Sequence, residues 1–279
     1  STTIATNAIL EQKGAVTAVL MTDGFEDALE IGRQKRSDMY NLFLDAETPV
    51  FLAPRRLRVG VVERLDAEGQ VLKPLDEHQL LEAVRRLRER YPVQSLSVCY
   101  LYSFLNPAHE LRTRELIQRH FPELSVSLSC EIDPVFREYE RVTLTTFDAY
   151  IRPRVSAYMS RLAEGLKAMG IRAPLQVMQS RGGLTTVGTA TDKPVSMLLS
   201  GPAAGVIGGR YAGIQSHLTD LITVDMGGTS FDVCLVKDGA PAMTAEGRIA
   251  RYPFGLPMLA IHTIGAGGGD LLAVGAEGD

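Results

Sequence analysis

The chain has no tryptophan and only three cysteines among its 279 residues, and aromatic residues make up just 6% of it. The cysteines are Cys99, Cys130 and Cys234, which are odd in number, far apart and set in apolar stretches. This pattern excludes a disulfide framework and a cysteine metal site. We therefore expect reduced, buried thiols, as is typical of a cytoplasmic protein.

An excess of basic residues and long apolar runs are also missing. The chain has 29 lysines and arginines against 33 acidic residues, a net charge of −4. Without a basic excess, neither nucleic acid nor an anionic membrane is expected as the main partner. No apolar run approaches the roughly 20 residues of a membrane helix. Hydrophobic residues at 45% and charged residues at 22% predict a globular protein of one large or two ordinary domains.

Glycine and acidic residues concentrate at the C-terminal end. Residues 200–279 hold 16 of the 26 glycines, and 4 basic against 8 acidic residues, which accounts for the whole net charge. Glycine clusters let backbone N–H groups approach a ligand, and neighbouring acidic residues can hold a cation. We therefore expect a change of role near residue 200.

Apolar periodicity alternates between helix and strand along most of the chain. This order predicts an α/β fold with mixed or parallel sheets covered by helices. The predicted strands are Ala15–Thr22, Arg56–Leu65, Ser95–Leu101, Ser125–Ser129 and Leu175–Met178. The predicted helices are residues 2–13, 25–32, 76–91 with Asp76 as N-cap, 106–121 opened by Asn106-Pro107, and 140–170 with a start or kink at Pro153.

The segment 221–236 carries the sharpest chemical signal. An apolar strand ends at Asp225, a Gly-Gly-Thr turn follows, and a second strand carries Asp232. The turn can offer backbone donors from Gly227 and Gly228 and hydroxyl groups from Thr229 and Ser230 to phosphate oxygens. The two aspartates could hold Mg²⁺ directly or through water. The alternative is an ordinary β-hairpin with an Asp-capped turn.

Two further glycine-rich segments flank this hairpin. Ser200–Gly209 reads as a helix whose glycines need close packing or backbone approach, and whose start would attract an anion; the alternative is a tight helix–sheet contact without a ligand. Residues 261–270 read as a strand that runs into a glycine loop, for which a flexible turn is the simpler interpretation, and His262 is interpreted as a structural histidine. The charged cluster Arg137–Arg141 is interpreted as a solvated helix start whose arginines and acids pair with one another.

Together these segments resemble the hydantoinase A/5-oxoprolinase family, to which N-methylhydantoinase and acetone carboxylase beta-like subunits belong. The resemblance rests on Asp225–Thr229, Ser200–Gly205 and Ile264–Gly269, and it extends over the whole chain in the family's order. Further matching segments are Ala5–Ala8, Glu138–Arg141, Ala149–Pro153 and Met178–Gly183. Asp148 and Asp270 depart from the residues expected at these two positions.

The resemblance implies an actin-like ATPase fold, of ribonuclease H-like lobes, in which two lobes close over ATP. Residues 1–200 would be the first lobe and residues 201–279 the start of the second. The first lobe's own Asp-x-Gly-Gly-Thr hairpin would precede Ser1, so we expect the 279 residues to be a fragment that is inactive alone. By resemblance, Asp225 and Asp232 are catalytic, with Asp225 serving Mg²⁺. The residues expected to contact the ATP phosphates are Gly227, Gly228, Thr229 and Ser230, with Gly201 in the connection between the two lobes. Those expected at the adenosine are Gly265, Gly267, Gly268 and Gly269.

The family's activity predicts ATP-dependent cleavage of a cyclic amide such as a hydantoin or 5-oxoproline, through phosphorylation of the lactam oxygen. A second hydantoinase B-type subunit or domain and a homo-oligomer are expected. Three alternatives stay open: an ATP-dependent carboxylase subunit, a small-molecule kinase, and a nucleotide-gated interaction module without turnover.

Overall fold

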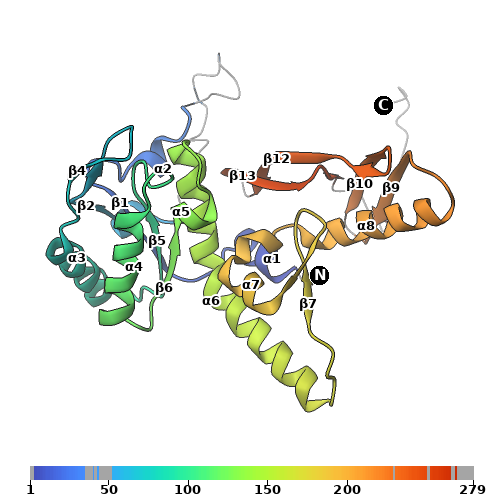
Figure 1. The fold of residues 1–279 in the computed structure, drawn as a ribbon, viewed down its shortest axis with the longest axis horizontal. Coiled ribbons are helices and arrows are strands. Elements are labelled where there is room, and N and C mark those ends of the chain that lie inside the picture. The colour runs from blue at the N-terminus through green and yellow to red at the C-terminus, as the bar shows by residue number, and fades with distance from the viewer. Residues whose placement is uncertain are drawn as a thin grey trace.

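The computed structural model describes residues 3–34, 40, 43, 52–228, 230–249, 252–264 and 268. A parallel sheet with its helices forms one end of the molecule, and an antiparallel sheet with one helix forms the other (Figure 1). A long helix, α6 (Glu138–Ala168), and a β-hairpin lie between them. This arrangement confirms the predicted α/β class with helix-covered sheets. Within the described residues, no helix combines the length and apolarity needed to span a bilayer.

The first sheet has four parallel strands in the order β2-β1-β5-β6. They are β1 (Thr17–Thr22), β2 (Arg58–Val61), β5 (Ser95–Cys99) and β6 (Ser125–Leu128). Every residue of the central strands β1 and β5 is buried. Burial on both faces explains why β1 has an uninterrupted apolar run between Thr17 and Thr22. In β5, the buried Ser95 and Ser97 alternate with Leu96 and Val98.

Helices cover both faces of this sheet. On one face, α3 (Glu77–Arg90) and α4 (Ala108–His120) bury apolar stripes such as Leu80 and Val84 against Leu20, Leu96 and Val98. On the other face, the N-terminal half of α6 packs against β5 and β6. The Asp76 side chain accepts a hydrogen bond of 2.9 Å from Gln79 N, which confirms the predicted N-cap of α3.

Short elements complete the first part of the chain and the region between the sheets. They are α1 (Ile4–Leu10), α2 (Ala28–Ile31), η1 (Arg55–Leu57), β3 (Arg64–Leu65), β4 (Val71–Lys73), α5 (Ser129–Ile132), β7 (Gln176–Met178), β8 (Leu184–Thr186), α7 (Val187–Asp192) and η2 (Pro194–Met197). The single strand predicted over Arg56–Leu65 is wrong, because a 3₁₀ turn precedes β2 and the chain leaves the sheet after Val61. Asn106 is the predicted cap and Pro107 the predicted first helical residue; the helix starts one residue later, at Ala108, and Asn106 Oδ1 accepts a hydrogen bond from Ala108 N at 3.1 Å.

Helix α6 runs unbroken through Pro153, so it does not start at this residue. Interior proline costs about 3 kcal/mol because it removes one helical hydrogen bond. Ile151 and Val155 on either side are buried in the core, and full burial of each such side chain contributes about 1.5–3 kcal/mol, which offsets this cost. Asp148, fully buried in the same helix, pairs with Arg152 at 2.6 Å and accepts from Val195 N at 3.1 Å, which ties α6 to η2.

The charged cluster at the start of α6 does not form the predicted solvated, mutually paired group. Arg141 is fully buried and donates from Nη2 to Tyr100 O at 2.8 Å. Glu140 pairs with Arg33, which lies far away in the sequence. Long-range packing against β5 therefore decides this segment, and no local pattern contains that information.

The second sheet is antiparallel. It comprises β9 (Leu221–Met226), β10 (Phe231–Lys237), β11 (Ala240–Pro241) and β14 (His262–Ile264), with β10 between β9 and β14. Helix α8 (Ser200–Gln215) covers one face of it. Ile222, Val224 and Met226 point to the opposite face, where each is more than half exposed.

The glycines of α8 set how closely the helix approaches β9. A Cβ at Gly209 would lie 2.6 Å from Thr223 Cγ2, and one at Gly213 would lie 2.4 Å from Leu221 Cδ2. Both distances are shorter than any normal contact, so α8 can pack here only without side chains at these positions. The close-packing interpretation of the Ser200–Gly209 glycines is thus confirmed for Gly209.

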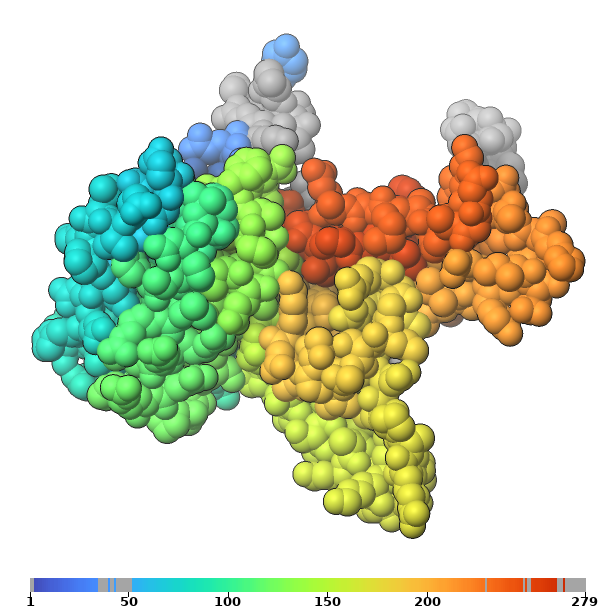
Figure 2. Space-filling view, in the orientation of Figure 1, coloured from blue at the N-terminus to red at the C-terminus, as the bar shows by residue number. Residues whose placement is uncertain are grey.

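The hairpin of β12 (Met243–Ile249) and β13 (Tyr252–Leu259) connects the two ends of the molecule. It packs against α6, where Phe147 meets Tyr252 and Phe254 edge to face with ring centroids 5.6 and 6.1 Å apart. The space-filling view shows this hairpin running from α6 toward the second sheet, while the C-terminal half of α6 projects from the body (Figure 2). The three cysteines are free; Cys99 and Cys234 are buried and Cys130 is partly buried.

Candidate functional site

The turn between β9 and β10 brings the two predicted acidic residues together. The strands pair antiparallel, and Asp225 lies directly opposite Asp232. Residues directly opposite in a sheet project from the same face, so both carboxylates lie on one side of the hairpin. Gly227 N donates to Ser230 O at 2.9 Å and closes the turn beyond them.

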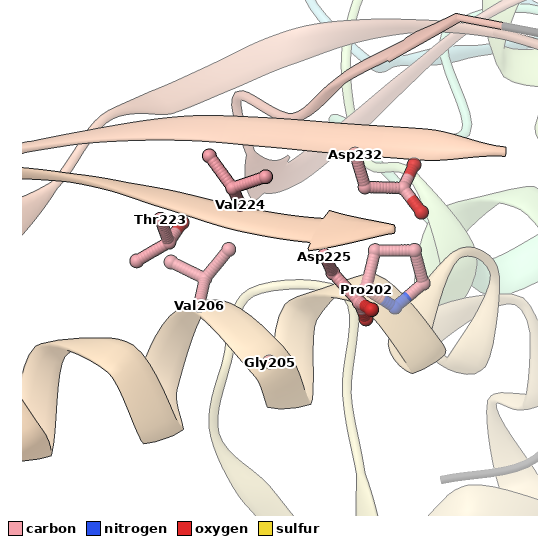
Figure 3. Close-up of a pocket in the computed structure, with 7 residues that line it drawn as sticks. All are labelled: Pro202, Gly205, Val206, Thr223, Val224, Asp225 and Asp232. Carbon is pink, nitrogen blue, oxygen red and sulfur yellow. The ribbon is translucent and has the colours of Figure 1, made fainter. Parts of the chain in front are cut away.

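Both carboxylates face helix α8. A hollow of about 300 Å³ lies between the helix and the hairpin, lined by Pro202, Gly205, Val206, Thr223, Val224, Asp225 and Asp232. In the close-up, Asp225 points toward Pro202 in the first turn of α8, and Asp232 reaches the same end of the hollow from the neighbouring strand (Figure 3). The N-terminal end of a helix carries a partial positive charge, which stabilises negative groups placed beside it.

Gly205 allows the close approach of helix and carboxylate. A Cβ at this position would lie 3.4 Å from Asp225 Oδ2. Gly205, Gly209 and Gly213 are each four residues apart, and they face Asp225, Thr223 and Leu221, which are each two residues apart on β9. The same glycine face therefore fixes the helix against the strand and places its first turn at Asp225.

The third strand, β14, adds a residue that the sequence did not single out. Thr263 pairs with Asp232 in the sheet, and its hydroxyl group donates to Asp232 Oδ1. The chain after β14 returns to the turn, where Gly268 N donates to Gly227 O at 2.9 Å. Pairing between strands more than thirty residues apart determines these contacts. The sequence therefore predicts a strand that runs into a glycine loop, but not the contacts that the two make.

The predicted site residues fall into three groups. Asp225, Asp232, Gly227, Gly228, Ser230 and Gly268 lie together around the hairpin turn. Gly201 lies in the first turn of α8, where a Cβ would meet nothing within 4 Å. Thr229, Gly265, Gly267 and Gly269 lie outside the described residues. His262 is exposed on β14 beside Thr263.

Not every predicted donor is available to a ligand. The amides of Gly227 and Gly268 are already bonded, to Ser230 O and Gly227 O. The amide of Gly228 has no partner among the described residues, and a Cβ at this position would meet nothing within 4 Å. Gly228 therefore offers an open backbone donor in the turn.

The acidic pair carries a charge that its surroundings do not neutralise. In the part of the chain that the structure describes, neither Asp225 nor Asp232 forms an ion pair. Like charges directly opposite one another destabilise a sheet. The same described residues contain no group of three or more potential metal ligands. A cation at this pair would therefore take its other ligands from water or a bound anion, which is the usual coordination of Mg²⁺ with a phosphate substrate.

Comparison with known proteins assigns the chain to a family. The hydantoinase/oxoprolinase N-terminal region matches residues 1–121, and hydantoinase/oxoprolinase matches residues 141–279. The chain belongs to the hydantoinase/oxoprolinase family, which confirms the resemblance seen in the sequence.

Named relatives and solved structures show the same relationship. The chain is 34% identical to caprolactamase subunit alpha of Pseudomonas jessenii, over 97% of this chain and 39% of that protein. The crystal structure of this ATP-dependent caprolactamase superposes with a TM-score of 0.85 over 96% of this chain and 39% of the other. A nucleotide-free acetone carboxylase structure, 28% identical, gives a TM-score of 0.81 over 95% of this chain and 38% of the other.

A 5-oxoprolinase of Saccharomyces cerevisiae is 31% identical over 98% of this chain and 23% of its own length. The chain thus spans about two fifths of the length of the caprolactamase and carboxylase relatives, and less of the oxoprolinases.

Proposed function

We propose that this chain forms the ATP-binding part of an enzyme that uses ATP to open a cyclic amide of the hydantoin or 5-oxoproline type. The observation that carries the proposal is the unneutralised pair Asp225 and Asp232, which faces the first turn of α8 beside an open Gly-Gly turn. Two relatives support the reaction type, since their names describe hydrolysis of cyclic amides, and one of them is called ATP-dependent.

The residues around the hairpin would divide the work of holding Mg²⁺–ATP. Asp225 would serve the metal, directly or through water, with Asp232 beside it; the donor set is all oxygen, which suits Mg²⁺. Gly228, with Thr229 and Ser230, would donate to the phosphates, and Gly227, whose own amide donates to Ser230 O, would hold the turn closed beside them. Gly201, in the first turn of α8, would approach the nucleotide without a side chain in the way. Gly265, Gly267, Gly268 and Gly269 would line the adenosine end.

The chain's contribution to the reaction is positioning and charge neutralisation. ATP would supply a phosphoryl group to the amide oxygen, which makes the carbonyl carbon electrophilic toward water, with ADP, phosphate and the ring-opened acid as the final products. The two aspartates hold negative charge where the metal is needed, and the turn amide of Gly228 meets the phosphate oxygens.

A complete enzyme would need more than these 279 residues. We include in the proposal a second phosphate hairpin from a preceding first-lobe segment, a hydantoinase B-type partner subunit or domain, and a homo-oligomeric, cytoplasmic assembly. Residues 1–200 and 201–279 would be parts of the two ATPase lobes. Relatives named as the alpha, beta and gamma subunits of caprolactamase and carboxylases support the partner subunit. Held from one side only, Mg²⁺–ATP would bind weakly to residues 1–279 alone, without turnover.

An ATP-dependent carboxylase subunit is the second candidate. The superposition on acetone carboxylase supports it. Bicarbonate separates the two functions: a carboxylase consumes ATP only when bicarbonate and a ketone are present, whereas a cyclic amidase needs neither.

The test is ATP turnover by the full-length protein with its partner subunit against a panel of cyclic amides, with and without bicarbonate. Asp225→Asn should abolish amide-dependent phosphate release. Asp238→Asn, an exposed residue at the other end of the same hairpin, is the matched control and should retain full activity. If Asp225→Asn stays within about tenfold of wild type, or roughly 1.4 kcal/mol of barrier, the metal role of Asp225 is wrong. Release of phosphate without any amide or ketone product would favour a nucleotide-gated module.

A further inference from the structure

Three polar side chains form a row across the second sheet. The register places Asp232 of β10 opposite Asp225 of β9 on one side and opposite Thr263 of β14 on the other. Residues directly opposite in neighbouring strands share a face, so Asp225, Asp232 and Thr263 lie side by side on the face toward α8. Thr263 is the member of this row that holds no charge, and it donates to Asp232 Oδ1.

This hydrogen bond decides which way the Asp232 carboxylate turns. The terminal torsion of aspartate is broad, so a carboxylate without an anchor rotates readily. Repulsion from Asp225 would rotate and displace it away from the shared hollow. The Thr263 hydroxyl occupies Oδ1 on the β14 side, and this leaves Oδ2 to face the other way. Threonine suits this role because its β-branched side chain has a stiff first torsion.

The position of Thr263 in the chain gives the contact a second consequence. One residue separates it from the glycine loop, and Gly268 in that loop donates to Gly227 O at 2.9 Å in the phosphate turn. The strand that anchors Asp232 therefore also carries the loop that meets the turn. A shift of β14 moves the acid and the loop together.

We propose that Thr263 is a positioning residue, which orients the Asp232 carboxylate toward the metal side of the Asp225–Asp232 pair. The proposal rests on the proposed binding of Mg²⁺–ATP at this hairpin. Thr263 itself contacts neither nucleotide nor metal; it acts through Asp232. Its removal should weaken the part of ATP binding that depends on the metal and leave the metal-independent part unchanged.

Two substitutions at position 263 test this in the full-length protein. Thr263→Val keeps the shape and removes the donor, and Thr263→Ser keeps the donor. The measurement is the Kd of ATP by calorimetry, once with Mg²⁺ and once with EDTA. Loss of one hydrogen bond to a charged group should raise the Kd with Mg²⁺ about tenfold in Thr263→Val, and Thr263→Ser should recover most of it. The Kd in EDTA should change less than twofold. Thr244→Val, which removes a threonine hydroxyl that bonds to the backbone of Glu246 in β12, is the matched control and should match the Kd of wild type.

Each outcome has a defined meaning. An unchanged Kd with Mg²⁺ in Thr263→Val overturns the positioning role. An equal loss with Mg²⁺ and with EDTA also overturns it, because a general distortion of the sheet would act on both. A thermal unfolding curve of each variant separates loss of the fold from a local effect on binding. Thr263→Ser serves the same purpose, because it keeps the hydroxyl donor at position 263. Wild-type protein that binds no ATP under either condition would instead refute the proposed function, on which this inference rests.

Discussion

Helix α8 offers a test of the packing that places the site, because it contains a crowded glycine and an open one in succession. Gly209→Ala would bring a methyl group to 2.6 Å from Thr223 Cγ2, whereas Gly208→Ala would meet nothing within 4 Å. Both changes replace a glycine inside the same helix, so both gain about 1 kcal/mol of helix propensity. The difference between their free energies of unfolding therefore measures the steric contact with β9.

The magnitude follows from the stiffness of the neighbour. Thr223 is β-branched and its Oγ1 donates to Cys234 O at 3.2 Å, so its methyl group cannot rotate away without loss of that bond. Overpacking of this kind costs about 1–3 kcal/mol. Gly208→Ala should therefore be as stable as wild type or more stable by up to about 1 kcal/mol. Gly209→Ala should be less stable than Gly208→Ala by about 1–3 kcal/mol.

Urea unfolding of both variants measures the difference directly. Thermal unfolding gives a second measurement, since a change of 1 kcal/mol in the free energy of unfolding shifts Tm by about 2–4 °C in a domain of this size. The Kd of Mg²⁺–ATP should also rise in Gly209→Ala alone, because displaced packing moves the first turn of α8 relative to Asp225. Equal stability of the two variants would show that α8 does not rest on β9 through its glycines.

Two further predictions concern the turn and a buried acid. Gly228→Val should leave the free energy of unfolding unchanged, because a Cβ at this position meets nothing within 4 Å. It should weaken ATP binding at least tenfold, because the side chain covers the open amide. An unchanged affinity for ATP in a titration would place the phosphates elsewhere. Burial raises the pKa of Asp133 above its ordinary 3.8, and its Oδ2 has no hydrogen-bond partner among the residues that the structure describes. Between 3.8 and the raised value the unfolded chain has released a proton that the folded chain retains, so the free energy of unfolding should fall as pH rises through that window. Asp133→Asn should remove this slope in urea titrations from about pH 4 to pH 7, and an unaltered slope would assign it to other groups.

Local sequence patterns predict correctly those elements whose structure depends on interactions between neighbouring residues. The Asp76 cap, the apolar stripe of α3 and the strand–turn–strand of 221–236 depend on side chains within a few positions of one another, and all three are observed. In the turn that joins β10 to β11, Asp238 and Gly239 both have positive φ, of 52° and 71°, as a tight two-residue hairpin requires.

The failures share a different cause, which is burial against a distant segment. The charges of Arg137–Arg141 look like a solvated helix start, but Arg141 is buried and donates to the carbonyl oxygen of Tyr100, which directly follows β5 some forty residues earlier in the chain. Pro153 looks like a helix boundary, but packing of the residues around it on the core keeps the helix continuous. Thr263 looks like an ordinary strand residue until the pairing of β14 with β10 places it beside Asp232.

The glycines of α8 show why the local sequence allows two interpretations of the same residues, close packing and attraction of an anion. Packing and anion attraction were alternatives in the sequence, yet in the structure the first produces the conditions for the second. Four helical residues advance about 6 Å and two strand residues about 6.8 Å, so a glycine at every fourth position can follow alternate residues of β9. Gly209 and Gly213 press the helix onto Thr223 and Leu221, and continuation of the same face brings Gly205 to Asp225. The helix start, with its partial positive charge, therefore meets the acidic pair because of contacts made one and two turns further along.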